Sequence, residues 1–502
     1  MALEFKRFGG YRLGSNIPLG KGAPWEAVAR VSRWGAPVIE LNTNAEKIGS
    51  LGLEAIRQQG KANDLVYTWH VPPSKDESGE LALPNSPNQN EFARAIMARA
   101  IKAAAEVGAR HITFHATNSV PRPEKDQVYV YNTQTNQVSV QRIIPGTDPK
   151  KTVEILNESS KAQFRTQLNR MEAQKRLVDN LEKTAETIAK QGVNEMNALQ
   201  IAGLVGQVTN YSSMVGLQPQ NTPEWIRIQN KAIRQEPLTQ HEKQVIEDYS
   251  KKVRQQLKDY KKLFENQLKQ LEPYKDKDMI LDGLEVMRRN VAENIAKIDK
   301  NALKLAVDKG ITLGFENLPA HMIFNTPEEL NDLRKKTVEA LVKKKVLTRE
   351  QAEKLIGFTF DTAHANTTKY IEINGKKYAS PSEFLKALKG PVYHVHAVDS
   401  VGIFDSHLPL GQGEITHEEM EKIEEALKKS GFKGAAIHEL GSSQLPVLYG
   451  SSAEWFEGGN YMIGGQPTAS FWGPSYLSAA MTDPLMLGKD RGYFNESFAD
   501  IF

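Results

Sequence analysis

Cysteine is the clearest absence from this sequence of 502 residues, which contains none. Without thiolates the chain cannot form cysteine zinc sites, iron–sulfur clusters, disulfides or a cysteine nucleophile. Any metal must therefore bind to His, Asp or Glu. Long apolar runs are also missing, because the best stretch, residues 198–216, is interrupted by Gln, Asn and Ser. We therefore expect no membrane partner and no membrane span.

An excess of charge of either sign is missing too. The 64 Lys and Arg residues and the 61 Asp and Glu residues leave a formal net charge of +3, which argues neither for nor against a nucleic-acid partner. The first ten residues carry charges but no apolar core, so we expect no signal peptide and a cytoplasmic protein. With 40% hydrophobic and 25% charged residues, the composition is that of a globular protein.

Short apolar runs rich in β-branched and aromatic residues recur along the chain, with helical patterns between most of them. The predicted strands are Tyr11–Ile17, Pro37–Leu41, Leu65–His70, His111–His115, Ile311–Glu316, Gly357–Asp361, Val392–His396 and Ala435–Glu439. The predicted helices are Pro24–Trp34, Asn90–Val107, Leu284–Lys309, Pro327–Lys344 and His417–Ser430. Eight alternating units favour an α/β fold of the (β/α)8 TIM-barrel type. An open doubly wound sheet is the alternative, but that fold gives no reason for the number of strand–helix units to be eight.

The interval between the fourth and fifth predicted strands is far too long for one connection. It contains a polar stretch, Pro121–Pro149, and charged helical patterns at Thr152–Gly192 and Glu224–Leu271. We predict barrel halves at residues 1–117 and 284–440, a mainly helical insertion at 118–283, and a Gly- and aromatic-rich C-terminal extension at 441–502. Because the insertion follows a strand, we expect it on the catalytic face, as a lid or a substrate grip. Its charge runs are equally typical of a solvated helix face.

Histidine or carboxylate side chains close six of the eight predicted strands, and more follow in the next loops. They are His70, His115, Glu316, Asp361, His364, His396, Asp405, His407 and Glu439. In a barrel these strand ends converge on one face. Clustered carboxylates repel one another and are costly to bury, and a bound cation is the simplest compensation. A single strand His is usually only packed, but nine such residues predict a metal site that suits zinc or manganese.

Side-chain alternation separates these residues from other histidines. His111 starts its strand and should lie at the far end of the barrel, whereas His394 should lie one layer below His396 and support it. His438 should point outward, toward the helices. We assign no role to three further histidines, His241, His321 and His417.

The ordered motifs resemble the endonuclease IV family (AP endonuclease family 2) of the xylose-isomerase-like barrel superfamily. Residues 360–364, Phe-Asp-Thr-Ala-His, resemble that family's FDTCH motif, and residues 396–400 resemble its HLNDS motif. Residues 405–407 followed by 410–413 resemble its D-R-H…LGEG segment, and residues 14–16 and 20–22 resemble its first strand and glycine turn. The resemblance covers most of residues 11–115 and 284–440, but neither the insertion nor the extension.

The resemblance implies up to three Zn²⁺ ions, although Mn²⁺ accepts the same ligands. One ion would be held by His70, His115 and Glu316, and a second by Glu316, Asp361, His396 and Glu439. The third would be held by His364, Asp405 and His407. The implied activity is phosphodiester hydrolysis, in which Glu316 and Glu439 are the catalytic residues: Glu316 bridges two ions and Glu439 lies beside the attacking water.

Two other functions remain open at this point. Sugar isomerases and epimerases of the same superfamily need one ion, for which Glu316, Asp361, His396 and Glu439 would suffice. His70, His115, Asp405 and His407 are the residues that such an enzyme does not need together. A non-catalytic barrel used for binding is the third hypothesis, and it predicts that Glu316→Gln leaves the biological activity unchanged.

The substrate is expected from the resemblance alone. The family acts on abasic sites in DNA, but the loops after the second and third strands, residues 42–46 and 71–74, lack the basic and aromatic side chains expected there. The basic stretch 251–262 of the insertion could replace them, although it is equally typical of a solvated helix. DNA and a phosphorylated small molecule are both open as partners.

Overall fold

The computed structural model describes residues 7–8, 11–16, 23–33, 36–72, 74–192, 200, 203–204, 223–372, 376–439, 462–463 and 466–467. The chain divides into two compact units, residues 1–130, 136–142 and 282–502 on one hand and residues 131–135 and 143–281 on the other. Each unit is described by itself below. Among the described residues, no helix combines the length and the apolar run that a membrane span requires.

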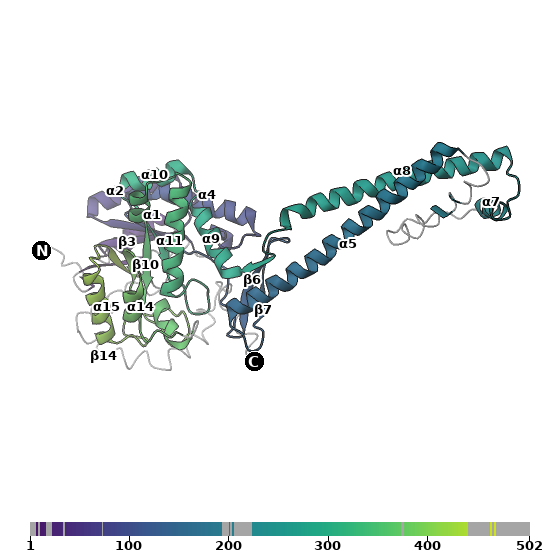
Figure 1. Cartoon of the computed structure of the whole chain (residues 1–502). Helices are drawn as coiled ribbons and strands as arrows, with labels where there is room; N and C mark the ends of the chain where they lie inside the picture. The colour runs from purple at the N-terminus through teal and green to yellow at the C-terminus, as the bar shows by residue number, and fades with distance from the viewer. Residues whose placement is uncertain are drawn as a thin grey trace. The chain divides into compact units, whose positions relative to one another are not determined.

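The first unit is a closed barrel of eight parallel strands, as the sequence predicts (Figure 1). Its strands, in order around the barrel, are β2 (Tyr11–Asn16), β3 (Val38–Asn42), β4 (Val66–His70), β5 (His111–Phe114), β9 (Thr312–Glu316), β10 (Ile356–Asp361), β11 (Val392–His396) and β12 (Ala435–His438). Pairing of β12 with β2 and of β2 with β3 closes the ring. A short strand, β1 (Arg7–Phe8), is antiparallel to β2.

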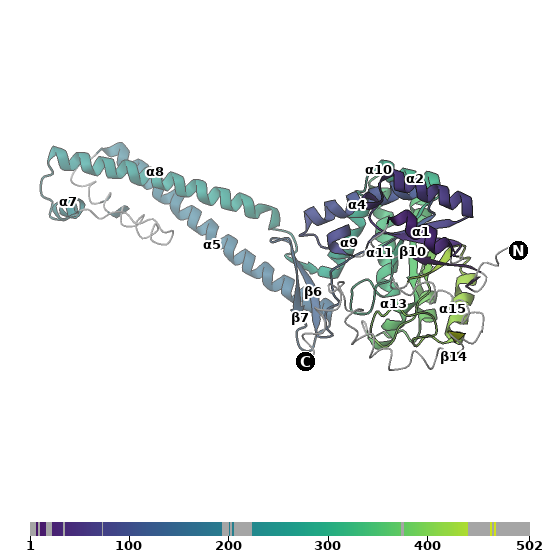
Figure 2. The ribbon, with the colours of Figure 1, turned by 180° about the vertical axis from the view of Figure 1, so that it is seen from behind.

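Helices surround this ring, and Figure 2 shows them from behind. They are α1 (Pro24–Arg33), α2 (Ala45–Asn63), α3 (Lys75–Ser78), α4 (Pro87–Val107), α9 (Gly283–Ile295), α10 (Lys300–Lys309), α11 (Pro327–Lys343), α12 (Arg349–Leu355), α13 (Thr362–Thr367), α14 (Pro381–Ala387) and α15 (His417–Lys429). One 3-10 turn, η2 (Thr368–Tyr370), follows α13. Fully buried aromatic rings such as Trp69, Phe315 and Phe360 form part of the core between strands and helices.

The second unit is built on two long helices, α5 (Pro149–Gln191) and α8 (Gln240–Leu271), with α7 (Pro223–Ile233) between them in sequence. On α5, Val178, Leu181, Ala185 and Ile188 are buried at spacings of three and four residues, and they share one apolar cluster with Ile246, Val253, Leu257, Tyr260 and Phe264 of α8. This spacing is that of a coiled-coil seam. We call the α5–α8 pair the arm.

Two sequence predictions about helices are wrong in detail. The predicted helix Leu284–Lys309 is two helices, because Asp299 caps the start of α10 by accepting from the backbone N–H of Asn301. The predicted helix Glu224–Leu271 is also two, because Thr239 and Glu242 form a capping box at the start of α8.

The polar stretch Pro121–Pro149, in which no strand was predicted, contains β6 (Gln127–Asn132) and β7 (Gln137–Arg142). These strands form a small sheet with β8 (Ile280–Asp282), which follows the 3-10 turn η1 (Glu272–Tyr274). Of the predicted extension 441–502, the structure describes only β13 (Met462–Ile463) and β14 (Gln466–Pro467), which pair antiparallel. The glycine turn at 20–22 lies outside the described residues.

Candidate metal centre

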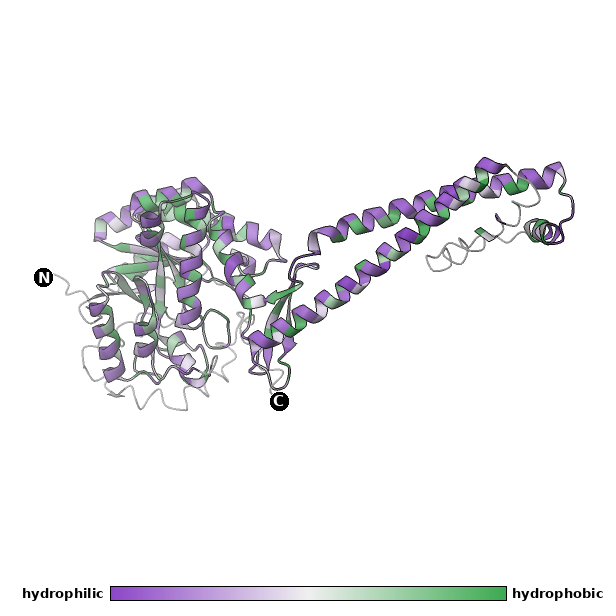
Figure 3. Ribbon diagram, viewed as in Figure 1, coloured by the Kyte–Doolittle hydropathy of each residue, from purple (hydrophilic) through white to green (hydrophobic). Residues whose placement is uncertain are grey.

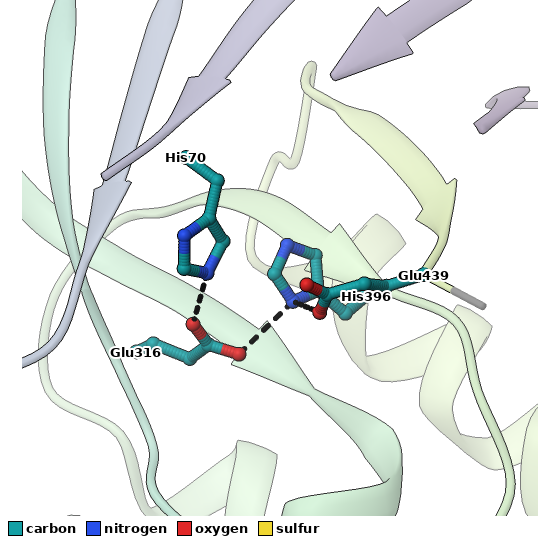
Figure 4. Close-up of side chains that lie close together, drawn as sticks. All are labelled: His70, Glu316, His396 and Glu439. Carbon is teal, nitrogen blue, oxygen red and sulfur yellow. Dashed lines mark hydrogen bonds and ion pairs between the residues drawn. The ribbon is translucent and has the colours of Figure 1, made fainter. Parts of the chain in front are cut away.

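The ends of six barrel strands bring histidine and carboxylate side chains together, and Figure 4 shows four of them. Glu316, the last residue of β9, lies at the centre of this group. Its Oε2 lies 3.0 Å from Nε2 of His70 and 3.0 Å from Nε2 of His115, while its Oε1 lies 3.0 Å from Nδ1 of His396. Glu316 therefore contacts residues that lie 80 to 246 positions away in the sequence.

His396, the last residue of β11, faces three carboxylates with a single nitrogen. Its Nδ1 lies 2.9 Å from Oε2 of Glu439, 3.0 Å from Oε1 of Glu316 and 3.5 Å from Oδ2 of Asp361. One N–H cannot serve three acceptors, and Oδ2 of Asp361 is buried without a hydrogen-bond partner. A cation placed among these oxygens would satisfy all of them.

A second group lies beside the first and is formed by His364, Asp405 and His407. Oδ1 of Asp405 lies 3.1 Å from Nε2 of His364 and 2.9 Å from Nε2 of His407, and the two nitrogens are 3.2 Å apart. Ligands of a tetrahedral zinc ion at about 2.0–2.1 Å are separated by about 3.3 Å, which is close to these distances. The ligand atoms of Asp361, His364 and His407 also lie within 4.8 Å of one another.

The sequence folds locally so that these side chains point inward. Asp361 ends β10 and caps α13 with one oxygen, which accepts from the backbone N–H of His364 at 2.6 Å and leaves Oδ2 directed into the group. Asn317 accepts from the backbone N–H of Asp361 and donates to its carbonyl oxygen. His407 has φ of 39°, in the left-handed region that a non-glycine residue rarely adopts.

Three of the histidines, His70, His364 and His407, share one feature: one ring nitrogen, here called the outer one, contacts a backbone carbonyl oxygen, and the other faces a carboxylate. The outer nitrogen is Nδ1 in His70, which lies 2.7 Å from the carbonyl oxygen of Val71, and in His364, which lies 2.7 Å from that of Asn317. In His407 it is Nδ1, 3.3 Å from the carbonyl oxygen of Glu439. Fixing the N–H on the outer nitrogen leaves the inner lone pair free, which is how proteins prepare histidine for a metal.

Burial and charge together perturb these groups. Burial lowers the pKa of His70, but the hydrogen bond and the charge of Glu316 outweigh it and raise that pKa to about 9. Burial likewise lowers the pKa of His364, yet the charges of Asp361 and Asp405 raise it to about 9. For Glu316, burial raises the pKa, and the charge of His396 with the hydrogen bonds of its histidine partners brings it well below its ordinary value. Residues with such opposing effects in one place are typical of functional sites.

All nine residues predicted from the sequence as ligands thus lie in one connected set of contacts. The grouping differs from the expected one in two respects: His70 lies with Glu316, His396 and Glu439 within 4.8 Å, and Asp361 lies with His364 and His407. His111 is bonded to Thr312, which begins β9, in keeping with a place at the far end. His438 is buried, and burial lowers its pKa to about 3.

Glu40 is the residue that the sequence analysis missed. It lies in β3, is 0% exposed, and contacts both His394 and His396. The only signal in the sequence is a carboxylate in the middle of an otherwise apolar strand, Pro37–Leu41. Such a residue is rarely buried without a partner.

Comparisons with known proteins agree with this fold. The sequence profile of a family described as xylose isomerase-like TIM barrel matches residues 28–196 and 275–458. An uncharacterized protein of Methanocaldococcus jannaschii is 32% identical over 137 residues, which are 26% of this chain and 38% of that protein. The match therefore spans well under half of the relative's length.

Solved structures with a similar fold include three sugar epimerases or proteins like them. A D-tagatose 3-epimerase-like protein is 14% identical with a TM-score of 0.43, over 89% of this chain and 97% of that chain. A 3-keto-D-glucoside 4-epimerase from E. coli is 11% identical with a TM-score of 0.41, over 89% and 98%. An L-ribulose 3-epimerase is 10% identical with a TM-score of 0.40, over 96% and 99%. Likeness at this level carries no weight for a substrate or a reaction.

Proposed function

This chain belongs to the xylose isomerase-like TIM barrel family, and on that premise we propose that it is a metal-dependent hydrolase of phosphate esters. The proposed ligands are the nine residues of the candidate metal centre: His70, His115, Glu316, Asp361, His364, His396, Asp405, His407 and Glu439. The proposed ions are zinc, up to three, with manganese as the alternative, since both accept these ligands.

One observation carries this proposal: the group of His364, Asp405 and His407 lies beside the group centred on Glu316. Its three ligand atoms are separated by 2.9–3.2 Å. A one-metal enzyme does not need Asp405 and His407 of this group, whereas a hydrolase can use several ions on one phosphate. The two groups are linked, because Oε2 of Glu439 lies 2.9 Å from Nδ1 of His396 and 3.7 Å from Nδ1 of His407.

The bound ions would supply a water of lowered pKa and positive charge close to the phosphate oxygens. The protein's own side chains have different tasks. Glu316 offers its two oxygens to different partners, and so keeps His70 and His396 at a fixed separation. Glu439 lies at the edge of the group with its side chain 13% exposed, where Oε2 is placed to accept the proton of an attacking water. The outer hydrogen bonds of His70 and His364 keep their rings oriented.

Sugar isomerisation or epimerisation is the second candidate. The observation that favours it is the convergence of Glu316, Asp361 and Glu439 on Nδ1 of His396, which is a complete one-metal set by itself. In that reaction Glu316 and Glu439 would carry protons next to the substrate carbonyl. The solved structures compared above bear names from this chemistry rather than from hydrolysis, but their likeness to this chain is too slight to choose.

The substrate of the proposed hydrolase is a phosphodiester, and DNA with abasic or otherwise damaged sites is the one that the endonuclease IV resemblance suggests. The alternative substrate with a phosphate ester bond is a phosphorylated small molecule. An abasic duplex and a small chromogenic phosphodiester, bis(p-nitrophenyl) phosphate, therefore make a useful pair of probes. Hydrolysis of both would support DNA, and hydrolysis of the small ester alone would favour the small molecule.

The deciding experiment compares Asp405→Asn and His407→Ala with wild type, after loading each protein with zinc or manganese. The proposal expects hydrolysis to fall more than about 100-fold in both variants, because a direct ligand should matter more than the outer partners that cost 10–100-fold. His241→Ala is the matched control, since His241 lies on α8 of the arm and is paired with Glu224. Epimerisation of a ketose by wild type that survives both changes, with no hydrolysis, would establish the second candidate instead.

A further inference from the structure

Glu40 is a carboxylate inside the barrel that the reaction described above does not use. It lies in β3, opposite Thr68 of β4, and is 0% exposed. Burying an ionised carboxylate is costly unless hydrogen-bond donors or charges compensate it. A carboxylate in this position therefore has to be held by specific partners.

The partners of Glu40 come from two other strands, β4 and β11. Oε2 lies 3.0 Å from Nε2 of His394, 3.5 Å from the hydroxyl of Thr68 and, in a hydrogen bond, 3.5 Å from Nε2 of His396. Oε1 is 3.2 Å from the same Nε2 but has no hydrogen-bond partner. His394 packs against His111, with ring centroids 5.2 Å apart. Because these groups fix Glu40 from several directions, its carboxylate presents an acceptor to His396 in one defined position.

His396 thus stands between two sets of acceptors, one at each ring nitrogen. Nδ1 faces the oxygens of Glu316 and Glu439, and Nε2 faces Glu40 (Figure 4 shows the Nδ1 side). A neutral imidazole carries one N–H. If the N–H is on Nε2 it donates to Glu40 and leaves the Nδ1 lone pair for a cation, whereas the other tautomer blocks the site.

We propose that Glu40 is a positioning residue that holds His396 as the Nε2–H tautomer and so presents Nδ1 to a divalent cation. This inference rests on the proposed function, because it takes the group around Glu316 to be a metal site. It also separates His396 from the other histidines: His70, His364 and His407 contact backbone carbonyl oxygens with their outer nitrogens, but His396 contacts a carboxylate. A carboxylate partner makes the imidazole a more basic ligand than a carbonyl does.

The test uses cobalt as a spectroscopic probe of the full-length protein. Co²⁺ is titrated into metal-free wild type, Glu40→Met and Glu40→Gln, and its visible absorption gives a Kd without any assay of activity. Glu40→Met should raise the Kd by about 10–100-fold, the usual effect of losing an outer partner of a ligand. Glu40→Gln keeps the volume and a neutral acceptor, and should raise the Kd by less than about tenfold, since a charge-assisted hydrogen bond is roughly twice as strong as a neutral one.

Glu329→Gln is the matched control, because Glu329 is a buried carboxylate outside the candidate metal centre whose Oε2 lies 2.6 Å from Nη2 of Arg122. It should leave the cobalt Kd unchanged. Nitrogen NMR of the metal-free proteins, at a pH where His396 is neutral, adds a second readout: His396 should be protonated at Nε2 in wild type and at a mixture of nitrogens in Glu40→Met. If Glu40→Met does not fold, the Glu40→Gln series carries the test.

The outcomes separate this inference from the proposed function. Wild type that binds cobalt, together with a folded Glu40→Met protein of equal affinity and unchanged His396 tautomer, would overturn the role of Glu40 and leave the proposed function standing. If Glu40→Met instead binds one Co²⁺ ion fewer than wild type, with unchanged affinity for the remaining ions, Glu40 is a direct ligand. That result would also overturn its role as a positioning residue. Wild type that binds no cobalt would overturn both.

Discussion

Charged side chains gather in both the barrel and the arm, but in opposite environments. In the barrel, Glu316 and its histidine partners are almost fully buried and come from strands far apart in the sequence. On the arm, Lys261 pairs with Asp179 and Glu182, and these side chains remain 13–36% exposed. Figure 3 shows the same contrast, with hydrophobic barrel strands and mainly hydrophilic arm helices. Abundant charge therefore indicates a functional site only where it is buried.

The energetic reason lies in desolvation. Exposed ion pairs such as those of the arm contribute about 0–1 kcal/mol each, because water competes for both partners. Buried charges lose their hydration, and removing one partner of a buried pair costs about 3–5 kcal/mol. A protein that keeps five carboxylates and several histidines together in its barrel must gain something other than stability from them, and we propose that this gain is the binding of a cation.

The largest expected effect is at the centre of the barrel cluster. Glu316→Gln removes a charge that faces His70, His115 and His396, so bound metal and hydrolysis should both fall, the latter by more than about 100-fold. Elemental analysis and hydrolysis of bis(p-nitrophenyl) phosphate measure the two. Glu158→Gln is the control, because its side chain lies on the arm and is 70% exposed. Unchanged activity in Glu316→Gln would favour the non-catalytic barrel.

A smaller effect is expected in the loop that carries Asp405 and His407. Asp399 holds this loop, because its carboxylate accepts from the backbone N–H groups of residues 400, 411, 413, 414 and 415. In Gly413→Ala the new Cβ would lie 2.4 Å from the carbonyl oxygen of Ser400 and 2.5 Å from Oδ1 of Asp399, so the loop must move.

We expect Gly413→Ala to lose the ion of the His364–Asp405–His407 group and about tenfold or more in hydrolysis, as when an outer partner is lost, while the ions around Glu316 remain. Metal counting on the purified variant checks this. Gln412→Ala, one residue earlier in the same loop, keeps the glycine and should retain every ion. A Gly413→Ala protein with full metal content would show that the hydrogen bonds around Asp399 do not position the His364–Asp405–His407 group.

The arm should matter to substrate binding but little to the metal centre. Deleting Thr152–Leu271 removes most of α5 and all of α8, whose apolar seam is internal to the arm. The barrel should stay folded and metal-loaded, with KM for the true substrate raised and kcat little changed. Thermal unfolding and metal content test the first part, and steady-state kinetics the second. A barrel that fails to fold without the arm would contradict this comparison.

The smallest effect concerns a single buried carboxylate on α15, outside the candidate metal centre. Burial raises the pKa of Glu424 to about 7, although Lys428 lowers it, and its side chain is 10% exposed. Because the pKa is higher in the folded than in the unfolded chain, the neutral form stabilises the fold below about pH 4.5, and this contribution is lost as pH rises to about 7.

Glu424→Gln keeps the neutral form at every pH. It should therefore raise the free energy of unfolding at pH 8 by about 1–2 kcal/mol after screening by solvent, and change little at pH 4.5. Urea unfolding of both proteins at the two pH values measures this. Glu425→Gln is the neighbouring control, because Glu425 is 64% exposed and paired with Lys429. If the free energy of unfolding changes between pH 4.5 and 8 by the same amount in wild type and in Glu424→Gln, the raised pKa of Glu424 is contradicted.

The eight barrel strands can be predicted from the sequence because each is marked by a local pattern of residues. Each strand is a short apolar run, so all eight are predicted within one or two residues of their ends, as with Val392–His396. The break before α10 was missed because it depends on the cap at Asp299, which does not disturb the apolar period. The strand β7 was missed because Gln137–Arg142 is mostly exposed and carries little apolar signal. Exposure does not explain the omission of β6, which has Val128, Tyr129 and Val130 buried.

The candidate metal centre could be predicted from the sequence only in part. The nine proposed ligands stand at strand ends or in the loops after them, where the barrel rule finds them. Glu40 could not be predicted, because its role depends on facing His394 and His396 across the barrel, about 354–356 positions away in sequence. Pairings of that kind follow from the closed barrel, not from any local pattern. The domain limits at 118 and 283 and the role of each ligand stay predictions.

Metal stoichiometry of the purified, untagged, full-length protein tests the central claim most directly. Elemental analysis after exhaustive dialysis should find two or three divalent ions per chain, mainly zinc, and they should be lost together with hydrolysis when a chelator is added. A single ion, manganese above all, would support the one-metal isomerase or epimerase. No tightly bound ion, even after reloading, would contradict the account of the cluster around Glu316.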